Sequence, residues 1–226
     1  MTEGPPAASN RLMSPLLAFT GGYVDTVGFI SLFGLFTAHV TGNFVLIGAS
    51  LVEREGGVAG KLLALPTFVA AVALAGLFIA RCARLKRDAG RPLLLMQALL
   101  LAGFLGCGLA ASAAAGPDDW TVILAGCVGV AAMGLQNAAS RTVFTRLAPS
   151  TVMTGNVTQV VLDLVAVTSG GADAALRARL QSMWPAILAF TVGALGGALA
   201  FAALGFWCLT IAIIAVLLTS ALHPRN

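Results

Sequence analysis

Charged side chains are scarce in this chain. Asp, Glu, Lys and Arg make up 10% of its 226 residues, whereas hydrophobic residues make up 58%. Soluble domains carry about 25% charged residues. A water-facing surface cannot be built from far fewer charged side chains than that. The scarcity excludes a soluble globular domain and predicts an all-α integral membrane protein whose main partner is the lipid bilayer.

Catalytic and metal-binding patterns are also missing. The two histidines, His39 and His223, lie far apart in the sequence, and the four cysteines show no CxxC spacing. The HExxH, GxSxG, Walker and GxGxxG motifs are absent from the sequence. The sequence therefore predicts no enzyme, metal or cofactor. The net charge of +4 does not indicate nucleic-acid binding, because the basic residues lie in short loops between apolar runs, as in membrane proteins.

The apolar runs divide the chain into eight expected helices. A membrane crossing needs about 20 residues, so the last and longest run is expected to form two helices with a tight turn near Gly205. Six elements are then long enough to cross, and two, at 41–52 and 154–168, are too short. Residues 1–11 lack a signal-peptide pattern and are expected to form a disordered tail. The runs cover residues 12–35, 40–52, 62–80, 92–115, 120–139, 152–168 and 183–222.

Both short elements begin with the same tripeptide. Thr41-Gly42-Asn43 in the first half matches Thr154-Gly155-Asn156 in the second. Upstream, GYVD at 22–25 stands against GLQN at 134–137, and a proline-containing span opens downstream of each tripeptide. Three landmarks in the same order predict an internal duplication within one membrane domain. Its halves are residues 12–115 and 120–222.

The basic residues distinguish two topologies. If all eight elements crossed the membrane, Lys and Arg would divide almost evenly between its two sides. If both short elements enter and leave on one side, only Arg54 and Lys61 lie opposite the other basic residues. The positive-inside rule favours this second arrangement, with both termini in the cytoplasm. It gives six transmembrane helices and two re-entrant half-helices in two inverted repeats, an architecture of channels and transporters.

The repeated tripeptides are the main candidate for a functional site. Half-helices that begin near the bilayer midplane would direct their positive dipole ends there. A carboxylate midway along the first span costs roughly 3 kcal/mol or more unless it is paired, protonated or hydrated, so it is a candidate proton-coupling group. The alternative is structural, with the tripeptides capping helices and the carboxylate satisfied by a local hydrogen bond. The candidate substrate-binding residues are Asp25, Thr41, Gly42, Asn43, Asn137, Thr154, Gly155 and Asn156.

Three further polar residues are secondary candidates. His39 precedes Thr41 by two residues and would titrate near neutral pH, although a histidine near a helix start is more often structural. Gln159 and Asp163 share one face of the second short helix with Asn156. Asp163 is expected either to face a vestibule or to lie at a solvated helix end.

Several of these residues carry a family resemblance. GYVD at 22–25, FTAHVTGN at 36–43 and MTGN at 153–156, followed by Gln159 and Asp163, resemble the YoaK-like family. These are bacterial multi-pass membrane proteins of unknown function, and the resemblance extends over about residues 12–222. It implies a location in the bacterial inner membrane and supplies no substrate.

Two functions follow from the residues. The leading hypothesis is a small-solute transporter or channel with proton coupling through Asp25. The alternative is a non-transporting membrane scaffold or lipid-binding protein in which the tripeptides are structural. A water-filled cavity that reaches Asp25 would favour the first, and a dry, filled interface the second. Small-residue patterns such as Gly193 with Gly197 would serve contacts within the chain or in a homo-oligomer.

Overall fold

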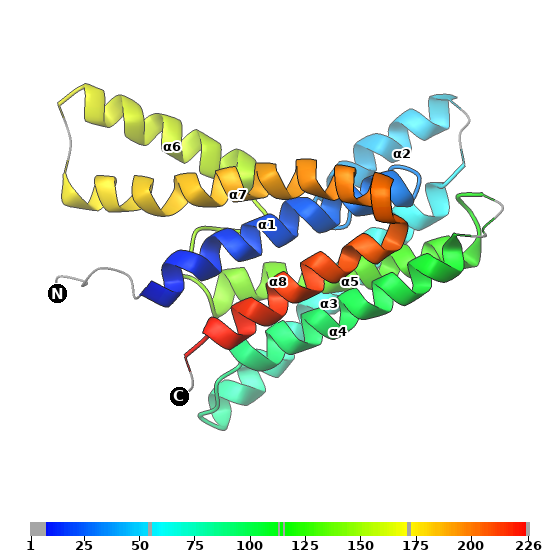
Figure 1. Ribbon diagram of the computed structural model, residues 1–226, viewed down its shortest axis with the longest axis horizontal. Coiled ribbons are helices and arrows are strands. Elements are labelled where there is room, and N and C mark those ends of the chain that lie inside the picture. The colour runs from blue at the N-terminus through cyan, green and yellow to red at the C-terminus, as the bar shows by residue number, and fades with distance from the viewer. Residues whose placement is uncertain (1–7, 54–55, 113, 115, 171–172, 225–226) are drawn as a thin grey trace.

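The computed structural model describes residues 8–53, 56–112, 114, 116–170 and 173–224. Every regular element in these residues is a helix, and the helices run roughly along the long axis of the molecule (Figure 1). The elements are α1 (Ala8–Ser31), α2 (Gly42–Glu53), α3 (Val58–Arg84), α4 (Gly90–Ala111), α5 (Trp120–Thr142), α6 (Met153–Thr168), α7 (Ala174–Leu204), η1 (Gly205–Cys208) and α8 (Leu209–Leu222).

The apolar helices fall into long and short ones. Four regions are long and apolar enough to cross a membrane: α3, α4, α5 and the continuous stretch Ala174–Leu222. That stretch is bent, because Gly205 (φ 55°) ends α7 and the turn η1 reverses the chain into α8 (Figure 1). The expected turn near Gly205 is therefore present. At 1.5 Å per residue, α2 and α6 span only about 18 and 24 Å, less than the about 30 Å of a bilayer core.

Two boundaries differ from the sequence-based expectation. Residues 1–7 of the expected tail at 1–11 lie outside the described residues, whereas residues 8–11 belong to α1. The last long run was expected to begin near residue 183, but α7 begins at Ala174. The Asp173 carboxylate caps this helix by accepting the backbone N–H of Leu176 (2.7 Å). A search for apolar runs misses these first turns, because they are amphipathic.

The two halves of the chain pack through each other. In the first half, α1 packs mainly against α7 and also against α8 of the second half. In the second half, α5 packs mainly against α4 and α3 of the first half. The short helices lie within their own halves, α2 against α3 and α6 against α7. Each half therefore uses the same set of contacts, and neither forms a separate core.

Glycines allow α1 and α7 to approach closely. A Cβ on Gly22 would lie 2.2 Å from the carbonyl oxygen of Phe190, and a Cβ on Gly193 would lie 2.2 Å from that of Phe19. A Cβ on Gly197 would lie 2.7 Å from a further carbonyl oxygen of α1. The Gly193 and Gly197 pattern therefore serves a contact within the chain.

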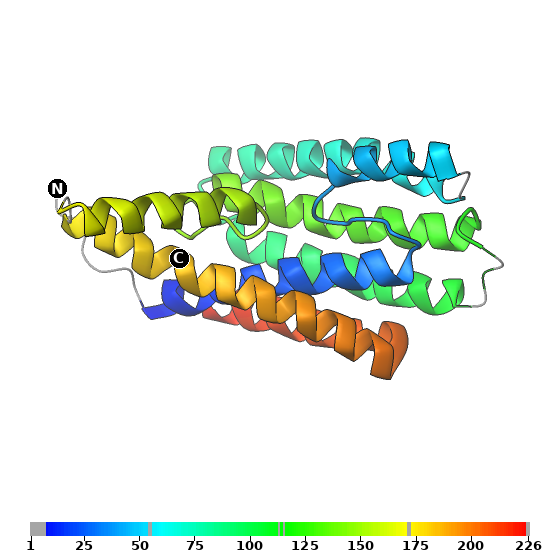
Figure 2. The ribbon, with the colours of Figure 1, turned by 90° about the horizontal axis from the view of Figure 1, so that it is seen from above.

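Each short helix ends at the same end of the molecule as the helix before it. After α1 the chain folds back toward the middle of the bundle, and α2 then runs outward to the end that α1 approaches (Figure 2). The segment 143–152 after α5 also turns back, and α6 runs outward to the opposite end of the molecule, the end at which α1 begins (Figure 2). Both Thr-Gly-Asn tripeptides consequently lie in the interior of the molecule's length.

Candidate functional site

Asp25 lies in a cradle of backbone amides. It is 5% exposed on α1, and its Oδ1 accepts the backbone N–H groups of Thr37 (2.8 Å) and Ala38 (2.6 Å). Successive N–H groups in a turn form a concave site for an anionic oxygen. The loop between α1 and α2 thus supplies the partners that a buried carboxylate requires.

His39 occupies the other oxygen of this carboxylate. Its Nδ1 lies 2.6 Å from Asp25 Oδ2, and its ring packs edge-on against Phe36 and Phe190. The Asp25 side chain is 6% exposed, whereas the His39 side chain is 39% exposed. His39 therefore lies between the buried Asp25 carboxylate and the more exposed side of the site. Its contact with Asp25 uses Nδ1 and leaves Nε2 as the ring nitrogen for other partners.

The asparagines of the two tripeptides close matching loops. Asn43 donates to the carbonyl of Phe36 (2.9 Å) and accepts its N–H (2.9 Å). Asn156 donates to the carbonyl of Pro149 (2.7 Å), also seven residues upstream, and proline has no N–H to return. Both asparagines are nearly fully buried. These bonds favour the structural alternative for Asn43 and Asn156.

The counterpart of Asp25 makes a simpler contact. Asn137 on α5 donates to Thr151 Oγ1 (3.0 Å) in the loop before α6. Asn137 therefore holds the loop before α6, as Asp25 holds the loop before α2. Its partner is one side-chain hydroxyl, whereas Asp25 accepts backbone N–H groups.

A buried glutamine chain lies beside this contact, and the sequence analysis did not single it out. Gln136 donates to Ser150 Oγ (2.9 Å) and to the carbonyl of Leu17 (2.8 Å), and it accepts from Gln97 (2.6 Å). The chain links α1, α4, α5 and the loop before α6. A glutamine within a long apolar run is a sequence signal for a buried polar contact. The sequence spacing alone does not show that Gln97 and Gln136 are partners.

One cleft lies between the two tripeptides. It measures about 240 Å³ and brings together residues from both halves of the chain. Of the candidate residues, His39, Thr41, Asn137 and Thr154 line it, whereas Asp25 lies behind His39. Gly42, Asn43, Gly155 and Asn156 are not among the lining residues. The lining comprises Ala38, His39, Val40, Thr41, Leu65, Phe68, Asn137, Thr151, Val152, Met153 and Thr154.

Gln159 and Asp163 belong to a separate cluster. Asp163 is 2% exposed and accepts a hydrogen bond from Gln159 (2.7 Å) on the same helix. Arg179 of α7 donates through Nε to Asp163 Oδ2 (2.7 Å). Neither Gln159 nor Asp163 lines the cleft between the tripeptides. This ion pair fixes α6 to α7.

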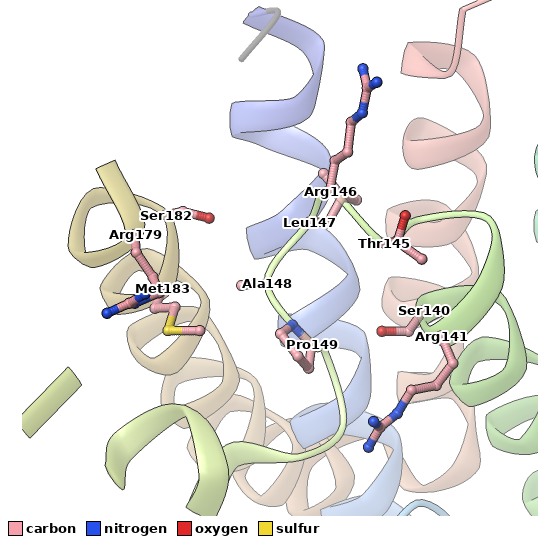
Figure 3. Close-up of a pocket in the computed structure, with 10 residues that line it drawn as sticks. All are labelled: Ser140, Arg141, Thr145, Arg146, Leu147, Ala148, Pro149, Arg179, Ser182 and Met183. Atoms are coloured by element: carbon pink, nitrogen blue, oxygen red, sulfur yellow. The ribbon is translucent and has the colours of Figure 1, made fainter. Parts of the chain in front are cut away.

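A second cleft, of about 330 Å³, is formed by the end of α5, the following loop and the start of α7. Three arginines line it, yet the side chains of Arg141 and Arg146 point away from each other (Figure 3). Arg179 is engaged by Asp163. The guanidinium groups do not converge on one point, so the cleft lacks the geometry of an anion clamp. Among all the described residues, no group of three or more His, Cys, Asp or Glu side chains is placed to hold a metal ion.

Comparison with known proteins places this chain in a family. The profile of a protein family of unknown function, DUF1275, matches residues 13–222. The chain belongs to the DUF1275 family. It is also 32% identical to the UPF0700 transmembrane protein YoaK of Bacillus subtilis (strain 168) over 160 residues, which cover 70% of this chain and 68% of YoaK. No solved structure matches it. It is thus a multi-pass transmembrane protein, as the sequence predicts.

Proposed function

We propose that this DUF1275 protein is a transporter or channel for a small polar solute, and not an enzyme. The observation that carries the proposal is the cleft between the two tripeptides, because it brings polar side chains from both halves together midway along an apolar helix bundle. Non-helical backbone at membrane depth is tolerated where it is packed in protein or lines an aqueous cavity. The loops 38–41 and 151–152 line this cleft, as that rule requires.

The helix arrangement supports an inverted-repeat topology. In this proposal α1, α3, α4, α5, α7 and α8 cross the bilayer, and α2 and α6 are re-entrant half-helices. Support comes from the matching contacts of the two halves and from each short helix ending where the preceding helix ends (Figure 2). Transporters built from inverted repeats hold their substrates near the midplane, where discontinuous helices begin.

The membrane orientation follows from the basic residues. Arginines and lysines cluster in the α3–α4 connection, and further arginines follow α5 and begin α7. The positive-inside rule assigns that end to the cytoplasm together with both termini. The similarity to YoaK of Bacillus subtilis supports the inner membrane of a bacterium as the location.

The four candidate residues that line the cleft have proposed roles. Thr41, Thr154 and Asn137 offer hydroxyl and amide groups to the solute, and His39 connects the cleft to Asp25. Transport is coupled to protons through Asp25, whose charge acts on the cleft by way of His39. The rival function, a non-transporting scaffold, is favoured by the loop-closing bonds of Asn43 and Asn156, which need no solute.

A flux assay on reconstituted protein tests the proposal. Proteoliposomes would be exposed to gradients of glycerol, urea and acetamide, and solute entry followed by stopped-flow light scattering. We expect at least one solute to enter about tenfold faster than in protein-free vesicles. Thr154→Trp should remove this increase by filling the cleft, whereas Thr158→Trp, at an exposed position one turn along α6, should not. Equal rates with and without protein would support the scaffold.

A further inference from the structure

We propose that the cleft between the two tripeptides binds a small anion together with one proton, and that His39 takes up the proton and contacts the anion. This inference rests on the proposed solute site and defines its substrate class. It assigns the proton to the cleft-lining imidazole and gives Asp25 a positioning role.

The first support is the position of the titratable groups. His39 is the one titratable side chain among the described residues that line the cleft. Asp25 is the charged group that faces it, from α1. The other neighbours are uncharged: Phe190 from α7, Phe36 from its own loop, and Leu65, Phe68, Asn137 and Thr151 across the cleft.

The second support is the charge of the pair. With a neutral imidazole, His39 and the Asp25 carboxylate carry a net charge of −1, and with an imidazolium the pair is neutral. An anion beside the pair is repelled in the first state and accepted in the second. Proton binding and anion binding therefore strengthen each other, and this coupling is reciprocal. A cation would show the opposite linkage, because it would favour the deprotonated pair.

The third support is the supply of hydrogen-bond donors. Asp25 Oδ1 is occupied by the amides of Thr37 and Ala38, and its Oδ2 by His39, so this carboxylate is not free to coordinate a cation. A protonated His39 offers Nε2–H to the cleft, and the hydroxyls of Thr41 and Thr154 are further donors. The α6 helix also begins in this cleft without a side-chain cap. The donor set matches an anion of a few non-hydrogen atoms.

Three solutes of one shape provide the test. Acetate, acetamide and acetamidinium are planar, have equal numbers of non-hydrogen atoms and differ in charge. The purified full-length protein in detergent would be heated with each solute at about pH 5.5 and about pH 8, which bracket the ordinary histidine range. Gluconate, a bulkier anion than acetate, would balance ionic strength. The rise in unfolding temperature reports binding to the folded state.

We expect acetate to bind at least about tenfold more tightly at the lower pH, and acetamidinium to gain nothing there. His39→Gln keeps a donor amide but cannot titrate, so it should remove the pH dependence. If that variant does not fold, Thr154→Trp leaves His39 and Asp25 in place and should abolish acetate binding at both pH values.

Four results would overturn the inference: acetate binding that is equal at both pH values, a preference for acetamidinium at high pH, acetamide binding as tightly as acetate, or no binding of acetate at all. Each leaves the proposed transport function standing if the flux assay shows solute entry. Acetate entry into proteoliposomes that is no faster than entry into protein-free vesicles, together with pH-linked acetate binding, would instead retain the anion site and remove transport.

Discussion

At the scale of single residues, the two tripeptides have one structural task in common. Each asparagine closes the loop that begins seven residues upstream, and the two closures differ in the backbone groups that pair with the asparagine. Phe36 offers both a donor and an acceptor, whereas Pro149 offers an acceptor alone. The repeat of Thr-Gly-Asn could be read from the sequence, but these bonds could not, because their partners carry no recognisable pattern.

Asn43 and Asn156 should therefore differ in their contributions to stability. Asn43→Ala leaves two backbone groups of Phe36 without their side-chain partner and should cost about 2–4 kcal/mol, while Asn156→Ala leaves one backbone group of Pro149 and should cost about 1–2 kcal/mol. The measurement is thermal unfolding of the two purified variants in the same detergent. A larger loss for Asn156→Ala would refute this account of the loops.

Folding should depend on the hydrogen-bond acceptors of Asp25, and transport should depend on its charge. Asp25→Asn keeps an oxygen for the amides of Thr37 and Ala38, so we expect a folded protein. We also expect a loss of pH-dependent flux, because His39 loses the carboxylate charge that stabilises its protonated form. Asp25→Ala removes the acceptor and should cost about 2–5 kcal/mol. Unfolding temperatures separate the two variants, and unchanged pH-dependent flux in Asp25→Asn would remove Asp25 from the mechanism.

At the scale of helices, glycine positions determine how α1 and α7 pack. The sequence could indicate that small residues lie at a helix contact, but not which contact, because intrachain and interchain packing use the same pattern. The turn at Gly205 was predictable from the length of the apolar run. The start of α7 was not, because the Asp173 cap precedes an amphipathic stretch.

Two glycines of α7 provide a matched pair. Gly193→Ala would place a methyl group 2.2 Å from a backbone oxygen of α1, whereas a Cβ on Gly196 meets no atom within 4 Å. We expect Gly193→Ala to cost about 1–3 kcal/mol, and Gly196→Ala to be neutral or slightly stabilising. Thermal unfolding of both variants is the measurement. Equal stability would show that α1 and α7 are not packed through Gly193.

At the scale of the whole molecule, the two halves of the chain interlock through matching helix contacts. The sequence predicted the two halves and the two short elements, and it placed Asp25 and Asn137 in corresponding positions. It did not show that α1 and α5 each pack on helices of the opposite half, since that pairing depends on tertiary contacts. It also did not separate the residues that line the cleft from those that close the loops behind it.

The proposed topology has its own test. Single cysteines would replace Lys86, in the α3–α4 connection, or Ala174, at the start of α7, both exposed. In a background without the four native cysteines, intact cells would be labelled with an impermeant thiol reagent. We expect both sites to be protected until lysis, because α6 enters and leaves on the cytoplasmic side. Labelling of Ala174→Cys from outside would instead make α6 a spanning helix.

The central claim is that the cleft between the tripeptides is an aqueous solute site. The most direct measurement is the reactivity of Thr154→Cys, in the cysteine-free background, toward a small impermeant methanethiosulfonate reagent in intact cells and in inside-out vesicles. Ala186→Cys, at a fully buried position, is the control and should not react. We predict that Thr154→Cys reacts in at least one of the two preparations. No reaction in either would mean a dry interface and would contradict the account.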